Sequence, residues 1–351
     1  MSTHRIAARV AVAAAVTAAF VAAPMVAGQA QAPEGWEVPR LADGRPDLQG
    51  VWASDSATPL QRPEELGDRE FLTDEEVAAL AAHVNDYSSV GGDAIFGETP
   101  FRRALAALDA PEDNDQQAAR PARRSTGSYN QFWMSGRWFE NRTSLIIDPP
   151  NGRLPPRTPE AEERAAQRRA EREAPLPERP TLAQEVARID PNIRCMGGGV
   201  LLSGRGYNST YQIFQTPSHV AILKEMYHET RMIPIGDAAP TELGPRSATG
   251  SSKAHWDGDT LVVETTNLSR GAGGSTRDVH VTERFTRVGP ELLQYEYTLD
   301  DPATWTEPWT ARIFMRPAPG TGIVYEFACH EGNYAIEHAL TNERYLDSQG
   351  Q

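Results

Sequence analysis

The feature that most constrains the fold of this chain is a succession of short β-type segments in its C-terminal half. After residue 205, nine such runs follow one another: TYQIFQ, HVAILKEMY, RMIPI, KAHW, TLVVETTN, HVTERFTRV, LLQYEYTLD, WTARIFMRP and IVYEFAC. Turn-forming residues separate them, as at 256–259 and 288–291, and helical periodicity is almost absent. A meander of this kind must close into a barrel or pack as a sandwich to bury its faces.

Two sets of side chains alternate along these runs, and neither set is wholly apolar. In 280–289, for example, Glu283 shares a face with Val281 and Phe285. A barrel whose lumen holds a ligand would show this mixture, and so would a sheet covered by the N-terminal region. We expect a mainly β fold, an antiparallel meander closing into a lipocalin-like barrel. A short strand ending at Trp52 carries the G-x-W form with which lipocalin barrels begin.

The region before the meander is predicted to be partly helical and rich in loops. Residues 71–87 have a helix start in which Thr73 and Glu76 form a capping box. A strand is expected around 143–147. The mixed-charge stretch 158–173 predicts a solvated helix supported by i,i+4 ion pairs.

The first residues have the pattern of an export signal. Arg5 and Arg9 precede a short, alanine-rich apolar run, and small residues follow, with cleavage expected after Ala30. Retention of the segment as an N-terminal anchor is the alternative. The mature chain is expected in the periplasm or secreted, without stable insertion in a membrane.

Four parts of the chain are therefore expected. They are a signal peptide at 1–30, an N-terminal region of strand, helices and wrapping loops at 31–190, a barrel domain at 191–346 and a tail at 347–351. No repeat of 20 to 50 residues is visible in the sequence.

The charge of the chain argues against a polyanionic partner. The formal net charge is −14, and loss of the two arginines in the signal would make it −16. Such a chain repels nucleic acid and anionic lipid. Among 34 basic residues only Lys224 and Lys253 are lysines, which we interpret as genome composition.

The two cysteines of the chain predict one disulfide in an oxidising compartment. A Cys195–Cys329 bridge would close a loop of 134 residues and hold the turn after Cys329 against 196–199. Free thiols or a metal bound by cysteine are the alternatives.

Several familiar catalytic patterns are missing. The sequence has no G-x-S-x-G, no H-E-x-x-H, no P-loop, and no G-x-G-x-x-G after a strand. Serine-hydrolase and nucleotide chemistry are therefore disfavoured, and we expect neither a cofactor nor a metal.

Histidines in polar company are the candidates for acid–base chemistry. They are His228, His255 and His330. Glu229 or Glu331 could fix the tautomer of a neighbouring imidazole, and Arg231 could hold a substrate oxygen or a carboxylate. The alternative is that each histidine caps a turn or fills a polar gap. A three-histidine metal site stays open, although spacings of 27 and 75 residues are no local ligand signature.

Aromatic and amide side chains are expected to line a substrate site. Those residues are Tyr211, Phe214, Tyr227, Asn267, Trp305, Trp309, Asn333 and Tyr334. An aromatic wall would bind a flat or apolar molecule by stacking. For Trp305 and Trp309 the alternative is a hydrophobic plug at one end of the barrel.

Long motifs across the chain resemble a known group of proteins. NRTSLIIDPPNGRLP, HWDGDTLVVETTN, DDPATWTEPWTA and YEFACHEGNY are similar to stretches of a large group of exported, mostly uncharacterised bacterial proteins, and the likeness spans about residues 40 to 335. The resemblance implies hydrolytic cleavage of lignin-type β-aryl ethers. It gives no single residue a role.

Two classes of function follow from these observations. The first is an exported, cofactor-independent hydrolase or lyase that cleaves an ether or ester bond in a small aromatic compound. In it, His330 oriented by Glu331 moves the proton, His228 or His255 protonates the leaving oxygen, and Arg231 stabilises negative charge. The second is a lipocalin-like periplasmic protein that binds a small apolar or aromatic ligand. The oligomeric state is not specified by the sequence.

Overall fold

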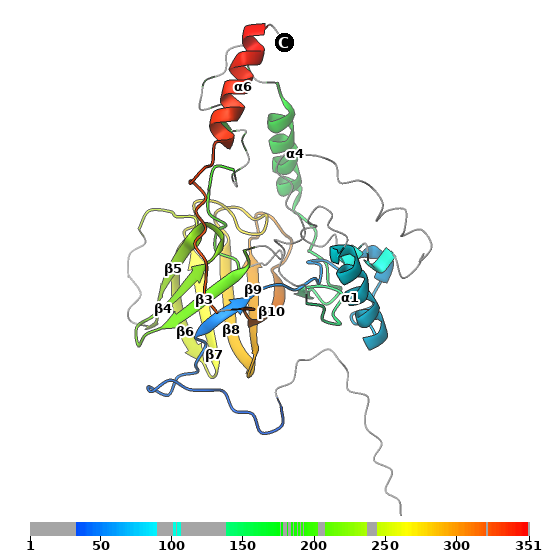
Figure 1. Ribbon diagram of the computed structural model, residues 1–351, viewed down its shortest axis with the longest axis vertical. Coiled ribbons are helices and arrows are strands. Elements are labelled where there is room, and N and C mark those ends of the chain that lie inside the picture. The colour runs from blue at the N-terminus through cyan, green and yellow to red at the C-terminus, as the bar shows by residue number, and fades with distance from the viewer. Residues whose placement is uncertain are drawn as a thin grey trace, which may run out of the picture.

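The computed structural model describes residues 33–89, 101–102, 104–106, 138–175, 177, 181, 184, 186–187, 189, 191, 193–202, 208–236, 244–320 and 322–349. A β-barrel forms its centre, a helical region lies to one side, and two helices extend beyond one end of the barrel (Figure 1). The expected signal segment and its cleavage after Ala30 lie outside the described residues.

Ten strands make up the sheet, and eight of the nine β-type runs coincide with one of them. The strands are β1 (Gly50–Ala53), β2 (Ile146–Asp148), β3 (Thr210–Gln215), β4 (His219–Lys224), β5 (Glu229–Pro234), β6 (Ser251–Asp257), β7 (Thr260–Thr266), β8 (His280–Gly289), β9 (Leu292–Asp300) and β10 (Trp309–Pro317).

The strands are arranged as a nearly closed antiparallel barrel. Nine of them follow the order β5-β4-β3-β1-β10-β9-β8-β7-β6, and every neighbouring pair is antiparallel. The first and last strands of this order meet at a bridge between Ile235 and Ala254. The predicted mainly β fold and antiparallel barrel are therefore confirmed.

Two strands from the N-terminal region complete the barrel wall next to β10. Trp52 of β1 pairs with Pro317, near the end of β10, and Asp148 of β2 pairs with Thr310, near its start. The Trp52 indole is buried and donates to the Leu48 carbonyl at 3.0 Å. Residues expected to wrap around a separate barrel domain thus form part of its wall.

Alternation along the strands decides which side chains enter the barrel. In β9, buried and half-buried residues alternate, and Tyr295 and Tyr297 belong to the buried set. In β8 the buried set includes Glu283 beside Phe285. The mixed face of the sequence is therefore the interior face, as the period of two in a strand requires.

The lumen is filled by side chains of the chain itself. Trp309, Tyr295 and Phe285 are each 1% exposed or less and belong to one continuous apolar cluster. Rings pack edge to face or tilted, as between Tyr297 and Trp309 with centroids 5.7 Å apart. These side chains therefore pack as an apolar core inside the barrel, and the ligand-holding lumen stays a prediction.

The ninth β-type run, IVYEFAC, forms no strand. Residues 323–328 have no regular structure, and Ile323 and Tyr325 are exposed. Residues 323–328 pair with none of the ten strands, although their sequence alternates as a strand would. This strand prediction is wrong.

Helices cover little of the barrel. The helices that the structure describes from end to end are α1 (Asp74–Ser89), α4 (Pro159–Glu173) and α6 (Ala335–Gln349), with short 3-10 turns η1 (Glu64–Leu66) and η4 (Met226–His228). The capping box of α1 is formed: Glu76 N donates to Thr73 Oγ1 at 3.2 Å, and Thr73 N donates to the Glu76 carboxylate at 2.8 Å. The last helix reaches Gln349, so most of the expected tail is helical.

The predicted ion pairs within α4 are absent. Thr158 caps this helix, accepting from Ala161 N at 3.1 Å. Along α4, which is described throughout, no carboxylate lies within ion-pair distance of a guanidinium; Gln167 bonds Glu171 instead, at 3.1 Å. The arginines of α4 therefore form no ion pair within the helix.

Candidate functional site

One end of the barrel, where β4 ends and β5 begins, is crossed by residues 195–202, here called the covering segment. Val200 and Leu202 of this segment are fully buried and belong to the barrel core. The segment therefore closes this end of the barrel from above, and its backbone groups must find partners inside.

Beneath the covering segment lies a set of charged and polar groups, the ionic cluster, in which Glu229 is half-buried and the others are buried. It consists of Lys224, Glu229, Arg231, Glu283 and Tyr295. Lys224 pairs with Glu229, and Arg231 binds Glu283 with both guanidinium nitrogens, at 2.7 and 3.1 Å. Tyr295 Oη donates to the Glu283 carboxylate at 2.8 Å. Two positive and two negative charges balance, which low-dielectric surroundings require.

The ionic cluster also supplies the partners of the covering segment. Three hydrogen bonds join them: Lys224 Nζ to the Gly199 carbonyl, Arg231 Nη1 to the Val200 carbonyl at 3.0 Å, and the Leu202 amide to Tyr295 Oη at 3.3 Å.

Burial and charge act differently on the members of this cluster. Burial lowers the pKa of Lys224, and the nearby Glu229 carboxylate only partly opposes this. For Arg231, burial alone would lower the pKa, but the Glu283 carboxylate outweighs it and the pKa is raised. Burial, followed by the charge of Glu283, raises the pKa of Tyr295 well above its usual value. Lys224 is thus the cation whose protonation is most easily changed.

The turn between β4 and β5 has an unusual backbone. Tyr227 and His228 both have left-handed φ angles, +62° and +51°. A residue with a side chain adopts this conformation at a cost of about 1–3 kcal/mol. The turn brings Glu229 directly opposite Lys224 in the ladder and leaves the His228 side chain exposed.

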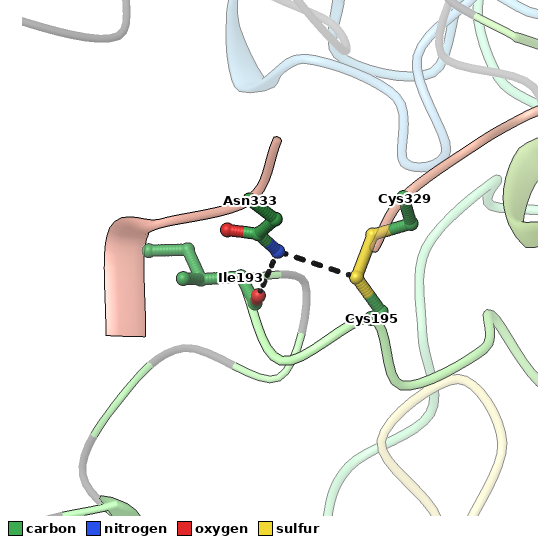
Figure 2. The surroundings of a disulfide bond; sticks show 4 residues. All are labelled: Ile193, Cys195, Cys329 and Asn333. Carbon is green, nitrogen blue, oxygen red and sulfur yellow. Dashed lines mark hydrogen bonds between the residues drawn. A yellow bond between two sulfur atoms is a disulfide. The ribbon is translucent and has the colours of Figure 1, made fainter. Parts of the chain in front are cut away.

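The predicted disulfide is formed and ties the C-terminal segment to the covering segment. Cys195 bonds Cys329, and both cysteines of the chain are used (Figure 2). Asn333 donates from Nδ2 to the Ile193 carbonyl at 2.9 Å and to Cys195 Sγ at 3.3 Å (Figure 2). His330 follows the bridge directly and is exposed.

Two further contacts bring these segments to the β4–β5 turn. The rings of Tyr227 and Phe327 pack edge to face with centroids 5.2 Å apart. A Cβ at Gly197 would lie only 3.1 Å from a carboxylate oxygen of Glu229, so the covering segment passes directly over that group. Three segments distant in sequence therefore meet at one end of the barrel.

Several of the residues expected from the sequence gather here. They are Tyr211, Tyr227, His228, Arg231, Cys195, Cys329, His330 and Asn333. Tyr211 is buried and lies opposite Lys224 in the ladder of β3 and β4, and burial raises its pKa. Glu331 is exposed, and none of the contacts among described residues joins its carboxylate to the His330 imidazole.

The role expected of Arg231 is wrong in one respect. Its guanidinium is 2% exposed and bound to Glu283, to Val200 and to the hydroxyls of Ser252 and Thr265, at 3.2 and 3.3 Å. A group so enclosed does not reach a substrate oxygen. It organises the interior of the barrel instead.

His255 and Phe214 lie elsewhere. Both are exposed on the outer face of the barrel, His255 on β6 near its hairpin turn and Phe214 on β3 opposite Ala221. The strand alternation that buries their neighbours turns these two outward. Both therefore face away from the ionic cluster inside the barrel.

Trp305, Trp309, Asn267 and Tyr334 also have structural positions. The two indoles are 2% and 1% exposed and pack edge to face at 5.6 Å, which makes them the plug that the sequence left open as an alternative. Asn267 has a left-handed φ and donates to the Gly244 carbonyl at 2.9 Å, so it stabilises a turn. Tyr334 is exposed and stacks on His338 of α6.

Sequence reasoning missed Lys224, Glu283 and Tyr295. A signal for the first was present, since Lys224 is one of two lysines in a chain whose cations are otherwise arginine. A signal for the second was a carboxylate placed between the apolar Val281 and Phe285 on the inward face of β8. Neither could be assigned before the register was known.

The described residues hold no group of three or more His, Cys, Asp and Glu side chains placed to bind a metal ion. The three-histidine site is therefore not formed by His228, His255 and His330. Within the same part of the chain, none of the helices combines the length and apolar character needed to span a bilayer.

Comparison of the chain with family models, with curated proteins and with solved structures finds no match. The resemblance expected from the long motifs stays a prediction.

Proposed function

We propose that this chain is an exported, cofactor-independent hydrolase or lyase that works at the covered end of the barrel. Its substrate would be an ether or ester of a small aromatic compound, such as a lignin-derived β-aryl ether. One observation carries the proposal: three segments bearing ionisable groups are held together there by the disulfide, the Tyr227–Phe327 ring contact and the contact of Gly197 with Glu229.

The energetics of this barrel end support a functional interpretation. Burying two ion pairs costs several kcal/mol per ion in desolvation, and an apolar plug would close the barrel at less cost. The chain does build an apolar plug elsewhere in the barrel core, from Trp305 and Trp309. Strained backbone together with ionisable groups of shifted pKa is typical of active sites.

Each group has a role in the proposed reaction. The exposed imidazoles of His330 and His228 would act as the general base and the general acid. Glu229 and Lys224 would supply a fixed charge pair beside them, with Lys224 able to change its protonation because burial lowers its pKa. The rings of Tyr227 and Phe327 offer an apolar surface for an aromatic substrate.

The carrier alternative has less support. A lipocalin-like carrier needs an internal cavity, and here large side chains fill the barrel interior. The proposed export is supported by the disulfide, which is typical of oxidising compartments, and by the signal-like first residues. Periplasm or secretion remains part of the proposal.

The proposal is tested by product formation in ¹⁸O-labelled water. Mature protein is incubated with a panel of aryl ethers and esters, and products are identified by mass spectrometry. The expected result is labelled product from a hydrolase, or unlabelled elimination product from a lyase, with a loss of rate of roughly 10²–10⁴-fold in His330→Ala or His228→Ala.

The matched control is His255→Ala, which removes an exposed imidazole from the outer face of β6. It should retain the wild-type rate. Equal rates in all three variants, or ligands recovered intact across the panel, contradict the proposed enzyme.

A further inference from the structure

A small cleft lies between one face of α4 and the loop that connects β7 to β8. The lining residues are Arg157, Ala161, Arg164, Arg168, Gly274, Ser275, Thr276 and Thr304. None of them belongs to the candidate functional site.

The helix side of the cleft is basic for a geometric reason. Ala161, Arg164 and Arg168 are three and four residues apart, so they share one face of α4, and Arg157 precedes the helix on the same side. The alanine side chain is buried and small, which leaves room between the guanidinium groups. Arg164 donates to the Ala303 carbonyl, which fixes its direction along the cleft.

The three guanidinium groups have no acidic partner. Among the described residues, no carboxylate lies within ion-pair distance of Arg157, Arg164 or Arg168. This is unusual in a chain whose formal net charge is −14. Three like charges gathered around a cleft attract an anion.

The loop side of the cleft is polar and held in place by Asp301. This buried carboxylate accepts from Thr276 N at 2.6 Å, from Thr276 Oγ1 at 3.2 Å and from Thr304 Oγ1 at 2.6 Å. These three hydrogen bonds to the Asp301 carboxylate hold Thr276 and Thr304 in place, and both residues line the cleft. One negative charge beneath three positive ones leaves the cleft with a positive balance.

We propose that this cleft binds a small oxyanion of the sulfate or phosphate type, either free or as the terminal group of a small organic molecule. Guanidinium groups bind such oxyanions through two parallel hydrogen bonds. Arg157, Arg164 and Arg168 all line the cleft, so their guanidinium groups face one shared opening. The inference is independent of the proposed enzymatic activity.

The test is isothermal titration of the mature protein with sodium phosphate, sodium sulfate and phenyl phosphate. Sodium chloride at the same ionic strength is the reference. We expect one anion bound per chain, and Arg168→Gln should weaken binding by roughly tenfold or more, since a hydrogen bond to a charged group is lost.

The matched control is Arg169→Gln, which makes the same charge change at the next residue of α4, outside the cleft. It should bind as the wild type does. Tighter binding of phenyl phosphate than of phosphate identifies an organic ligand, and the opposite order identifies the free ion. Heats no greater than those of chloride, or equal weakening by both variants, overturn the proposal.

Discussion

At residue 224 the chain uses a lysine where nearly all its other cations are arginines. The Lys224 ammonium reaches two acceptors in different directions, the Glu229 carboxylate and the Gly199 carbonyl. A compact charge on a flexible stem can do this, whereas the planar arginine fork fixes the directions of its donors. The choice of lysine is therefore explained by the position and not by genome composition alone.

Removing this amine should cost stability. Lys224→Met leaves Glu229 beneath the covering segment without its cation, and the unfolding free energy should fall by about 3 kcal/mol. Urea unfolding followed by fluorescence measures the change. Lys253→Met is the control, because that lysine is 65% exposed in its pair with Glu264 and its loss should cost less than about 1 kcal/mol. Equal losses in the two variants would show that burial of Lys224 is unimportant.

The buried tyrosines give the stability of the protein an alkaline limit. Burial raises the pKa of Tyr297 above its ordinary value of 10.0. In the unfolded chain the Tyr297 phenol loses its proton above pH 10, whereas in the folded chain the phenol stays protonated. The contribution of Tyr297 to the unfolding free energy is therefore fully present below pH 10 and is lost as the pH rises above it.

The titration of Tyr297 should therefore lower the unfolding free energy at pH 11 by roughly 1.4 kcal/mol relative to its value at pH 8. Tyr297→Phe should lose correspondingly less stability between these two pH values, as measured by urea unfolding. Tyr325→Phe changes a tyrosine that is 64% exposed and should behave like the wild type. A Tyr297→Phe curve parallel to that of the wild type contradicts the argument.

At the scale of elements, the barrel seam depends on one side chain. A single backbone bridge joins the ends of β5 and β6. Arg231 of β5 reaches across this seam to Ser252 of β6, Thr265 of β7 and Glu283 of β8. The ion pair of Arg231 with Glu283 thus links β5 to β8 across the seam, where backbone hydrogen bonding between β5 and β6 is sparse.

A double-mutant cycle measures this connection. Arg231→Met leaves the buried Glu283 carboxylate without its cation, and Glu283→Gln leaves the buried Arg231 guanidinium without its anion. Each single variant should lower the unfolding free energy by about 3–5 kcal/mol. The double variant should be more stable than the sum of the two losses predicts, because no charge is then left alone. Additive losses would mean that the two side chains do not act as a pair.

Much of the barrel can be predicted from the sequence because its strands are bounded by turn residues. TYQIFQ is β3 from end to end, and LLQYEYTLD is β9. The run at 323–329 has the same local pattern but pairs with none of the ten strands, and local pattern carries no information on available partners. Glycines at 320, 322 and 332 with positive φ surround it, which favours turns over a continued strand.

The site was less predictable, for a related reason. The disulfide could be inferred because only one pairing exists for two cysteines. The pair of Arg231 with Glu283 spans 52 positions and depends on the register of four strands. Side-chain type identified candidates such as His255 and Phe214, but only the strand phase determines which face a residue occupies.

For the molecule as a whole, the disulfide joins the C-terminal segment to the barrel. The bridge between Cys195 and Cys329 closes a loop of 134 residues, worth about 3–5 kcal/mol in the chain-entropy description. The barrel ladder itself does not include residues 322–334.

Replacing both cysteines by serine should therefore release this segment while the barrel persists. We expect limited proteolysis to cut within 322–334 in the double variant and not in the wild type, with far-ultraviolet circular dichroism nearly unchanged. Full loss of the β signal in the variant would show instead that the barrel requires the bridge. Wild-type protein treated with a reductant provides a second route to the same comparison.

The position of β1 has a consequence for the time at which the barrel can form. Trp52 pairs with Tyr211 on one side and with Pro317 on the other, the latter 265 positions further along the chain. During synthesis from the N-terminus, β1 cannot pair with both β3 and β10 until nearly the entire chain has been made. Contacts so distant in sequence make folding slow. A nascent chain of this protein should therefore lack a closed barrel until β10 emerges, and one truncated before residue 309 should never close its barrel.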